Sequence, residues 1–448
     1  LDFAVGGDPA ALYARLRRAQ RARHGAFICT GDWTVLSFSP ELFFARDGDR
    51  LTCRPMKGTL ARGLDAAADR AQRARLAADP KNRAENLMIV DLMRNDLARL
   101  ALPGSVRVGN LFDVEALATV LQMTSTIHAT IAHDTPLSAL FRALFPCGSV
   151  TGAPKIRAME IIAELEQTPR GVYTGAIGFA GPGATARFSV PIRTMVIDAA
   201  GRGRLGIGSG IVAESDVAAE YRECLLKARF LDADWPPFDL FETIGWTPRD
   251  GYRLIDEHLA RLAASAAYFG FAFESADARR RLAEAAARFA GAPMRVKLSL
   301  SRLGHMAVEA RLLPPAPAAM PTIGPARQAV DSRDCFLYHK TTRRGLYETE
   351  RRHAAATHGW FDVVFENERG EITEGSFTTV FIERDGGLLT PALSCGLLPG
   401  VLRGALLRDK DVTCREAVLT RHDLATARHV YVGNALRGLI AVHWSASE

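Results

Sequence analysis

The chain is poor in lysine, and its cysteines form no recognisable pairs. Only seven of its 56 basic residues are lysine. The seven cysteines include no C-x-x-C pair and no histidine at zinc-binding spacing, which argues against a small zinc module and indicates reduced cytosolic thiols. No apolar run is long enough to cross a bilayer and no signal peptide opens the chain, so we expect a cytoplasmic protein with no membrane partner.

Length and charge indicate a globular protein of several domains. The 448 residues are 48% hydrophobic and 24% charged, which predicts two or more domains with cores of their own. The net charge of +6 comes from scattered rather than clustered arginines, so we expect no nucleic-acid partner, whereas a small anionic substrate fits. Because arginine supplies most of the positive charge of this chain, each of its few lysines is a candidate for amine chemistry.

Residues 145–166 predict a small-residue loop that enters a helix. Apolar residues recur at helical spacing in its second half: Ile156, Met159, Ile162 and Leu165. Pro154 fits the first helical position, and Ser149 and Thr151 could cap the first turn. Such a loop lets backbone amides approach an anion, although an ordinary capped helix is the simpler interpretation.

A long, largely buried helix is predicted from Asn82 to Leu100. Glu85 shares a stripe of this helix with Met88, Ile89 and Leu92. A carboxylate on a buried stripe must be paired or bind a cation, because isolated burial of its charge costs several kcal/mol. An arginine or lysine partner is as good an explanation as a metal ion.

Two elements before the centre of the chain carry further polar residues. A strand is predicted over 204–212, running through the glycines of 206–210, and a helix follows over 215–232. One side of that helix presents Glu220, Glu223 and Lys227, which could equally be a solvated Glu–Lys face. The acidic, double-proline stretch 232–237 predicts a linker, dividing the chain into domains 1–235 and 236–448.

The first domain resembles chorismate-utilising enzymes, and most closely aminodeoxychorismate synthase component I. The blocks that carry the resemblance are S-P-E-L-F (39–43), R-P-M-K-G-T (54–59), A-E-N-L-M-I-V-D-L-M-R-N-D-L (84–97), Q-M-T-S-T-I (122–127), G-S-V-T-G-A-P-K-I-R-A-M-E-I-I (148–162), P-I-R-T (191–194), G-S-G-I-V-A-E-S-D (208–216) and A-E-Y-R-E-C (219–224). It implies an α+β chain that begins with the C-terminal portion of a chorismate-binding β-sandwich with helices. The family has further residues before this portion, so the domain looks N-terminally truncated, and an inactive scaffold is one alternative.

Lys57 separates the subfamilies, because anthranilate synthases carry alanine at the matching position. The resemblance implies that the neutral Lys57 amine attacks ring carbon 2 of chorismate, that Glu41 protonates the departing 4-hydroxyl, and that ammonia then displaces the lysine. Gln122 stands where anthranilate synthases have histidine, which fits amination without pyruvate elimination at this site. An anthranilate synthase-like activity remains the alternative.

The resemblance also implies the ligands of this site. Magnesium would be held by Glu85 and Glu223, with Glu220 nearby. The carboxylates of chorismate would be held by Thr151, Arg193, Lys227 and the backbone of Gly208, Ser209 and Gly210. No G-x-C-x-G glutaminase motif is present, so ammonia would be free or come from a separate glutamine amidotransferase subunit.

The second domain resembles fold-type IV pyridoxal-phosphate enzymes, most closely 4-amino-4-deoxychorismate lyase. The matching stretches are F-E-T-I-G-W (241–246), H-L-A-R-L-A-A-S-A-A-Y-F-G-F (258–271), Y-H-K-T-T-R-R-G-L-Y-E (338–348), G-E-I-T-E-G-S-F-T-T-V-F-I (370–382), L-L-P-G-V-L-R-G-A-L-L (397–407) and V-G-N-A-L-R-G-L (432–439). The resemblance implies a two-subdomain fold that binds pyridoxal 5'-phosphate and commonly forms a homodimer.

Within this domain, Lys340 would carry the cofactor and transfer protons, and Glu374 would keep its pyridine nitrogen protonated. The phosphate would be held by Arg261, the amides of Val401 and Leu402, and Asn434. A branched-chain or D-amino acid aminotransferase is the alternative. Together, the two resemblances imply a bifunctional enzyme that aminates chorismate and then eliminates pyruvate, giving 4-aminobenzoate for folate.

Overall fold

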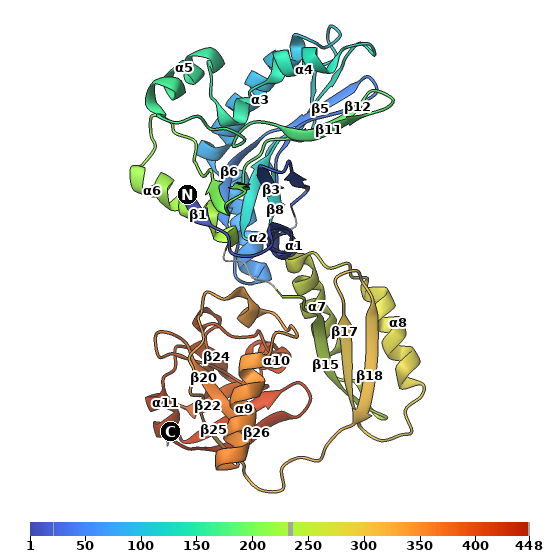
Figure 1. The fold of residues 1–448 in the computed structure, drawn as a ribbon. Coiled ribbons are helices and arrows are strands. Elements are labelled where there is room, and N and C mark those ends of the chain that lie inside the picture. The colour runs from blue at the N-terminus through green and yellow to red at the C-terminus, as the bar shows by residue number, and fades with distance from the viewer. Residues whose placement is uncertain (21, 232–235, 447–448) are drawn as a thin grey trace. The chain divides into compact units, whose positions relative to one another are not determined.

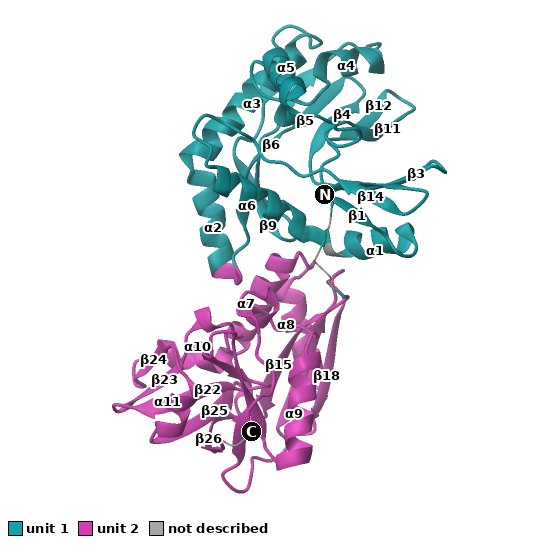
Figure 2. Ribbon diagram, turned by 60° about the vertical axis from the view of Figure 1, so that its left-hand side comes forward, with its two compact units in different colours: residues 1–63, 68–236 teal, residues 64–67, 237–448 magenta. Residues whose placement is uncertain are grey.

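The computed structural model describes residues 1–20, 22–231 and 236–446. The chain separates into two compact units, one of residues 1–63 and 68–236, the other of residues 64–67 and 237–448 (Figure 2). Residues 232–235 of the predicted linker lie outside the described residues, so the boundary at 235/236 stays a prediction. All seven cysteines are free thiols. Among the described residues, no helix combines the length and the apolar character needed to span a bilayer.

The described residues of the first unit form three antiparallel sheets (Figure 1). The five-stranded sheet has the order β1 (Asp2–Ala4), β14 (Arg202–Leu205), β13 (Thr194–Asp198), β3 (Trp33–Ser39) and β2 (His24–Cys29). The six-stranded sheet has the order β11 (Ile177–Gly181), β12 (Thr185–Ser189), β4 (Leu42–Asp47), β5 (Arg50–Arg54), β10 (Ile127–Thr130) and β7 (Arg107–Val108). The small sheet has the order β6 (Met56–Ala61), β9 (Val120–Thr124) and β8 (Asp113–Ala116).

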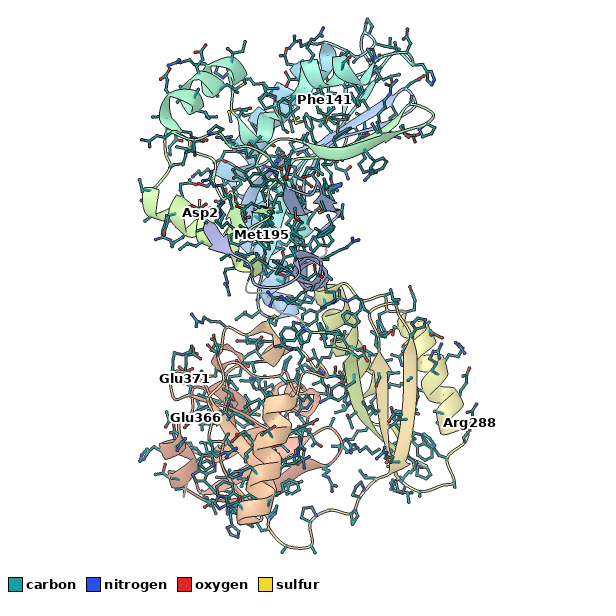
Figure 3. The ribbon with its side chains drawn as sticks, in the orientation of Figure 1. Asp2, Phe141, Met195, Arg288, Glu366 and Glu371 are labelled. Carbon is teal, nitrogen blue, oxygen red and sulfur yellow. The ribbon has the colours of Figure 1, made fainter. Side chains whose placement is uncertain are left out.

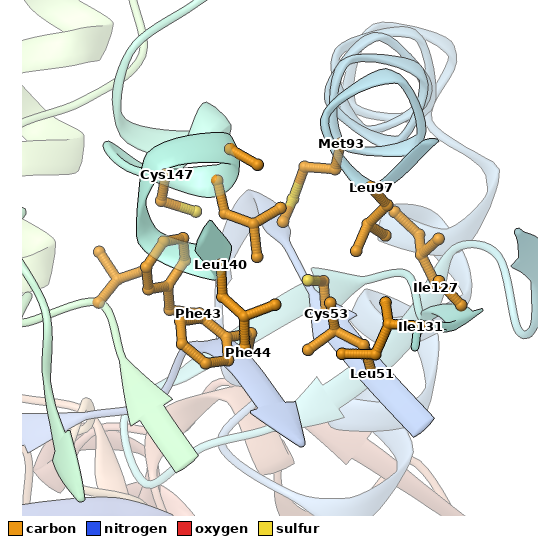
Figure 4. Close-up of a cluster of buried hydrophobic side chains, with 14 of the residues drawn as sticks. Phe43, Phe44, Leu51, Cys53, Met93, Leu97, Ile127, Ile131, Leu140 and Cys147 are labelled. Carbon is orange, nitrogen blue, oxygen red and sulfur yellow. The ribbon is translucent and has the colours of Figure 1, made fainter. Parts of the chain in front are cut away.

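The first unit also contains the helices α1 (Pro9–Gln20), α2 (Ala66–Ala78), α3 (Pro80–Ala98), α4 (Leu137–Leu144), α5 (Lys155–Leu165) and α6 (Val217–Ala228). Of these, α1, α2, α3 and α4 contribute buried side chains to its cores. One face of α3 and α4 packs on the six-stranded sheet around Phe43, Leu51 and Met93 (Figure 4). Met195 of β13 belongs to a second core beneath α1, whereas Phe141 of α4 packs on the first (Figure 3).

The sequence explains where α3 begins, but not how far it is buried. The Asp79 carboxylate accepts a hydrogen bond from the Asn82 amide at 2.8 Å, and Pro80 occupies the first turn, where no amide is needed. The prediction of a largely buried helix was wrong for its outer face, because Leu87 is 44% and Met88 39% exposed. Glu85, on the border between the two faces, is half-buried.

Two other elements differ from their predictions. The strand predicted over 204–212 ends with β14 at Leu205, and the glycine-rich residues 206–212 form a loop. α5 buries none of its side chains, and Ile156 and Leu165 are each 75% exposed. Its N-cap is Pro154, and no side chain caps it, so the caps expected from Ser149 and Thr151 are absent.

In the part of the second unit that the structure describes, there are two sheets, each with its own helices, as expected for two subdomains. The four-stranded sheet has the order β16 (Gly251–Tyr252), β15 (Leu240–Thr247), β17 (Met294–Leu300) and β18 (Met306–Leu312), and it packs with α7 (Ile255–Phe269) and α8 (Ser275–Ala286). The eight-stranded sheet has the order β21 (Ile372–Gly375), β20 (Asp362–Glu366), β19 (Thr322–Pro325), β26 (Gly438–Trp444), β25 (His429–Asn434), β22 (Thr379–Arg384), β23 (Gly387–Pro391) and β24 (Cys414–Ala417). The remaining helices are α9 (Gly345–His358), α10 (Val401–Arg408) and α11 (Arg421–Thr426). The helices and mainly antiparallel sheets of the two units confirm the predicted α+β class.

Candidate active sites

In the first unit, β6 places Lys57 against the glycine-rich loop. A Cβ atom on Gly210 would lie only 2.8 Å from the Lys57 Nζ, so glycine leaves the space that the amine occupies. Gly58, with φ +84°, lets the next turn of chain approach α3, where a Cβ would lie 2.7 Å from the Asn82 Oδ1. Lys57 thus lies next to the glycine-rich loop, and the residue after it lies against the helix that carries Glu85.

Glu41, between β3 and β4, is a buried carboxyl that stays protonated to unusually high pH. Its side chain is 3% exposed, and the Ser149 hydroxyl donates a hydrogen bond to its Oε1 at 2.5 Å. Burial raises the pKa of Glu41 to about 7, although the Ser149 hydrogen bond and the charge of Lys57 oppose the rise. A carboxyl with this pKa can donate a proton near neutral pH.

The Lys227 ammonium of α6 joins the predicted substrate loop to a predicted metal ligand. Its Nζ forms an ion pair with the Glu223 Oε1 at 2.7 Å and donates a hydrogen bond to the Gly208 carbonyl at 3.0 Å. The Ser215 hydroxyl donates to the Glu220 Oε1 at 2.8 Å. Both carboxylates of α6 are therefore already held by partners.

Glu85 lies close enough to the Glu220 and Glu223 carboxylates to be influenced by their charges. Desolvation raises its pKa, and the charges of Glu220 and Glu223 raise it further, while Lys57 opposes them. Within residues 1–20, 22–231 and 236–446, however, no three His, Cys, Asp or Glu side chains come close enough to hold a metal ion. The three oxygen-donor side chains fit magnesium in their chemistry, but Glu223 would have to leave Lys227 to bind it.

The remaining predicted substrate residues are Arg193, Thr151 and Ser209. Arg193 has φ +51° and is 9% exposed, and none of the described residues accepts a hydrogen bond from its guanidinium. Burial lowers its pKa to about 10. The Thr151 hydroxyl donates to the Cys147 carbonyl at 3.1 Å, within its own turn, and Ser209 is half-buried in the glycine-rich loop. In the described part of the chain, no hydrogen bond joins these three side chains to Lys57 or Glu41.

In the second unit, the predicted cofactor residues line one cavity of about 490 Å³, a size typical of small-molecule sites. Lys340 enters it from the loop after the 3-10 turn Cys335–Tyr338, with its Nζ 4.8 Å from the centre of the Phe241 ring. Burial and the charges of Arg261 and Arg344 lower the pKa of Lys340 to about 7. A neutral amine is therefore available near neutral pH.

Glu374 of β21 faces the same cavity. The Tyr347 hydroxyl of α9 donates a hydrogen bond to its Oε1 at 3.0 Å. Burial raises the pKa of Glu374 to about 7, although the charge of Arg344 opposes the rise. Because Lys340 lies close enough to influence this pKa as well, the two groups share one electrostatic environment.

The start of α10 forms the anion-binding end of the cavity. Gly400 is its N-cap and no side chain caps the helix, so the amides of Val401 and Leu402 are left for a ligand. Arg261 lies beside them, donating from its Nη1 to the Pro399 carbonyl at 3.1 Å. A Cβ on Gly400 would lie 2.6 Å from the Thr379 Oγ1, so only glycine fits at this end of the cavity without displacing Thr379. These residues fit a phosphate group.

Asn434 lines the cavity, but its side chain chiefly holds its own loop. Its Oδ1 accepts hydrogen bonds from the Leu436 and Arg437 amides, both at 3.1 Å. Its Nδ2 donates to the Phe377 carbonyl at 3.3 Å, which leaves one N–H for a ligand.

Sequence reasoning assigned no role to Glu242, which lies behind Arg261. Glu242 is 1% exposed and receives two hydrogen bonds from Arg261, at 2.8 and 2.6 Å, and one from the His258 Nδ1 at 2.7 Å. Burial alone would raise its pKa, but the charge of Arg261 and the His258 hydrogen bond hold it at about 2. A charged residue at an inward position of strand β15, between Leu240 and Ile244, was the signal that could have found it. Ser149 and Tyr347, which orient Glu41 and Glu374, were also missed.

Residues 1–233 match the family of chorismate binding enzymes, and residues 239–443 match amino-transferase class IV. Aminodeoxychorismate synthase component 1 of Salmonella typhimurium is 48% identical over 219 residues, covering 48% of this chain and 48% of that protein. Anthranilate synthase component 1 of Streptomyces coelicolor is 44% identical over 222 residues, covering 49% of this chain and 43% of that protein. The chain thus spans about half the length of the curated relatives that it matches.

Among solved structures, a provisionally named amino-acid aminotransferase of Mesorhizobium loti is 40% identical to this protein. It covers 46% of this chain and 100% of its own, with a TM-score of 0.44. The family match at residues 1–233 extends over more than half of the chain. The chain therefore belongs to the chorismate binding enzyme family and carries an amino-transferase class IV domain in its second half.

Proposed function

We propose that this chain is a bifunctional, cytosolic enzyme that makes 4-aminobenzoate for folate. Its first half would aminate chorismate to 4-amino-4-deoxychorismate, and its second half would eliminate pyruvate from that compound. The observation that carries the proposal is the presence, in one chain, of Lys57 in a chorismate-family site and Lys340 in an anion-binding cavity. Relatives named aminodeoxychorismate synthase component 1 support the first activity.

In the first half, Lys57 would act as the nucleophile. Its neutral amine attacks ring carbon 2 of chorismate while Glu41 gives its proton to the departing 4-hydroxyl, which leaves as water. Ammonia then bonds to carbon 4, and the lysine nitrogen leaves carbon 2. The pKa of Glu41, about 7, makes its acidic form abundant near neutral pH.

The binding residues of this half would neutralise the charges of chorismate. Bound magnesium would supply positive charge beside the ring carboxylate, held by Glu85, Glu220 and Glu223. Arg193 has a buried guanidinium without a protein acceptor in the described residues, which suits a carboxylate. Thr151, Lys227 and the backbone of residues 208–210 would complete the substrate contacts.

In the second half, bound pyridoxal 5'-phosphate would supply an electron sink for the elimination. The Lys340 Nζ would hold and transfer a proton, a role that its lowered pKa of about 7 supports. Glu374 would hold a proton shared with the pyridine nitrogen, and Tyr347 would orient its carboxyl group. Arg261, the amides of Val401 and Leu402, and the free N–H of Asn434 would bind the phosphate.

The partners belong to the same proposal. Ammonia would be supplied by a separate glutamine amidotransferase subunit, and the second half would form a homodimer, as its family resemblance implies.

The test is an assay of the chain with chorismate, ammonium and magnesium, after loading with pyridoxal 5'-phosphate. We expect 4-aminobenzoate, with no product from Lys57→Ala and accumulation of aminodeoxychorismate by Lys340→Ala. Formation of anthranilate instead would overturn the first half of the proposal. Transamination of branched-chain or D-amino acids without pyruvate release from aminodeoxychorismate would overturn the second. Activity of the lyase alone would make the first half a scaffold.

A further inference from the structure

One lysine of the first unit is largely buried but has no part in the proposed chemistry. Lys155 begins α5, directly after the loop 145–154. Its Nζ forms an ion pair with the Asp96 Oδ2 at 3.0 Å, and the two side chains are 14% and 7% exposed. The same Nζ donates a hydrogen bond to the Leu144 carbonyl at 2.9 Å. Lys155 is therefore a paired cation that contacts both α3 and α4.

These two contacts close the loop and fasten it to α3. Leu144 ends α4 and Lys155 begins α5, so their hydrogen bond joins the two ends of the loop. Asp96 lies in the last turn of α3, on which the loop also packs, since a Cβ on Gly148 would lie 2.8 Å from the Leu92 Cδ2. The ion pair thus fixes the end of the loop that leads into α5.

Hydrophobic packing does little to hold the start of α5. None of the side chains of α5 is buried, none of the described side chains caps its first turn, and Ile156 is 75% exposed. The Arg170 Nη1 donates to the Val150 carbonyl at 2.9 Å, which joins the loop to the chain after α5 and not to the core. The Cys147 side chain, by contrast, belongs to the hydrophobic core and is 1% exposed (Figure 4). Loss of the ion pair should therefore release residues 149–155 and leave the core intact.

The loop carries the side chain that orients Glu41. The Ser149 hydroxyl donates to the Glu41 Oε1 at 2.5 Å, and both side chains are buried. Because a hydrogen bond weakens steeply as its geometry departs from the optimum, a small displacement of the loop would break this contact. Only residues 150–154 separate Ser149 from Lys155, so the position of one constrains the other.

We propose that Lys155 and Asp96 are positioning residues of the first active site: their ion pair holds the loop so that the Ser149 hydroxyl reaches the Glu41 carboxyl group. Neither residue touches the substrate or the reacting atoms in this role. The inference rests on the proposed function only in treating Glu41 as the general acid, since the contacts that carry it lie within the protein.

The experiment measures the pKa of Glu41 in the full chain without substrate, from the infrared absorption of its protonated carboxyl group against pH. The band is identified by its loss in Glu41→Gln. The Cys147 thiol near Glu41 has a pKa of about 12 and stays neutral. The other groups that face Glu41 are unchanged in single variants at Lys155 and Asp96: the Ser149 hydroxyl, the Met56 amide, and the Lys57 and Lys227 ammonium groups.

We expect Lys155→Met and Asp96→Ala each to raise the pKa of Glu41 as far as Ser149→Ala does, because all three lose the hydrogen bond that stabilises the charged carboxylate. The direction in Asp96→Ala is decisive, because removal of a negative charge would by itself lower this pKa. Lys155→Arg keeps the ion pair and should keep the pKa at about 7. Arg157→Met, which removes an exposed cation of the same helix, should also leave it unchanged.

A double variant separates positioning from a general loss of packing. In the Ser149→Ala background, Lys155→Met should produce no further rise in the pKa of Glu41, because the hydrogen bond is already absent. Additive shifts would overturn the inference, as would an unchanged or lowered pKa in Asp96→Ala.

A parallel amination assay with chorismate, ammonium and magnesium distinguishes this result from the proposed function. No amination, together with a Glu41 pKa that depends on Lys155, would overturn the proposed activity and support the positioning. Amination with an alkaline limb that moves in Ser149→Ala but not in Lys155→Met would support the activity and overturn the positioning.

Discussion

At the scale of single residues, Ser149 controls the protonation of Glu41. The carboxyl is buried, and burial favours its neutral form, whereas the hydrogen bond from the Ser149 hydroxyl stabilises the charged form. Removing that hydroxyl therefore raises the pKa of Glu41 above its present value of about 7. If Glu41 is the general acid, the rate of amination falls at alkaline pH as this proton is lost.

We therefore predict that Ser149→Ala shifts the alkaline limb of the pH–rate profile of amination to higher pH. The measurement is kcat against pH in saturating chorismate, with the concentration of free ammonia held constant so that its own titration does not contribute. Ser149→Thr keeps the hydroxyl and should keep the limb in place. An unchanged limb in Ser149→Ala would show that another group sets it.

Glu242 would act on the cofactor only indirectly, by holding the Arg261 guanidinium in place. It fixes the Arg261 guanidinium with two hydrogen bonds, and its charge is maintained although it is buried. We predict that Glu242→Gln weakens binding of pyridoxal 5'-phosphate by about 10-fold, because one partner of a buried charge pair is lost and Arg261 is left free to turn away.

The affinity is measured by titrating the apoprotein with the cofactor and following its absorbance. Glu309→Gln, an exposed change on β18 of the same unit, is the control and should bind normally. An unaltered affinity in Glu242→Gln would mean that Arg261 needs no support. The circular dichroism spectrum of the variant shows whether the unit still folds.

At the scale of elements, the cap of α3 supports the helix that carries Glu85. Asp79 caps it through the Asn82 amide, and an Asp→Ala change at an N-cap typically costs about 1 kcal/mol. We predict that Asp79→Ala lowers the free energy of unfolding of the first unit by about that amount, measured from the earliest urea transition. Asp79→Asn keeps a capping oxygen and should lose less. Equal losses in both variants would contradict a role for the cap.

The features of a helix or strand that neighbouring residues determine could be predicted from the sequence. The features that depend on packing against distant residues could not. The Asp79-Pro80 pair marks the start of α3 by itself, whereas its burial depends on which face meets the six-stranded sheet. The exposed Ile156 of α5 shows the same limit, because periodicity identifies a helix without identifying its neighbour. Residues 206–210 do not form the predicted strand, because their glycines lie very close to Tyr173 and Lys57. These contacts come from distant parts of the chain, so the local sequence does not reveal them.

The candidate sites were predictable where a motif carried a reactive side chain. Lys340 and Glu374 line one cavity although 33 residues of chain, including α9 and β20, lie between them. Tyr347, which orients Glu374 through its hydroxyl group, lies 27 residues away on α9, and nothing in the sequence pairs it with that carboxyl group.

At the scale of the whole molecule, the residues of each candidate site belong to one unit. Lys57 and its neighbours lie in the first unit, and the cavity with Lys340 is lined by residues of the second. Each half should therefore act on its own substrate when the other half is disabled. We predict that Lys57→Ala and Lys340→Ala proteins, each unable to form 4-aminobenzoate from chorismate, form it when mixed, after a lag in which the intermediate accumulates in solution.

A two-step version separates diffusion of the intermediate from contact between proteins. The Lys340→Ala protein is incubated with chorismate, ammonium and magnesium and then removed by filtration, and the Lys57→Ala protein is added to the filtrate. Formation of 4-aminobenzoate in the filtrate shows that the first half works alone and releases its product into solution. If only the unmodified chain forms product, the intermediate does not survive transfer and the two halves depend on one another, which would contradict their independence.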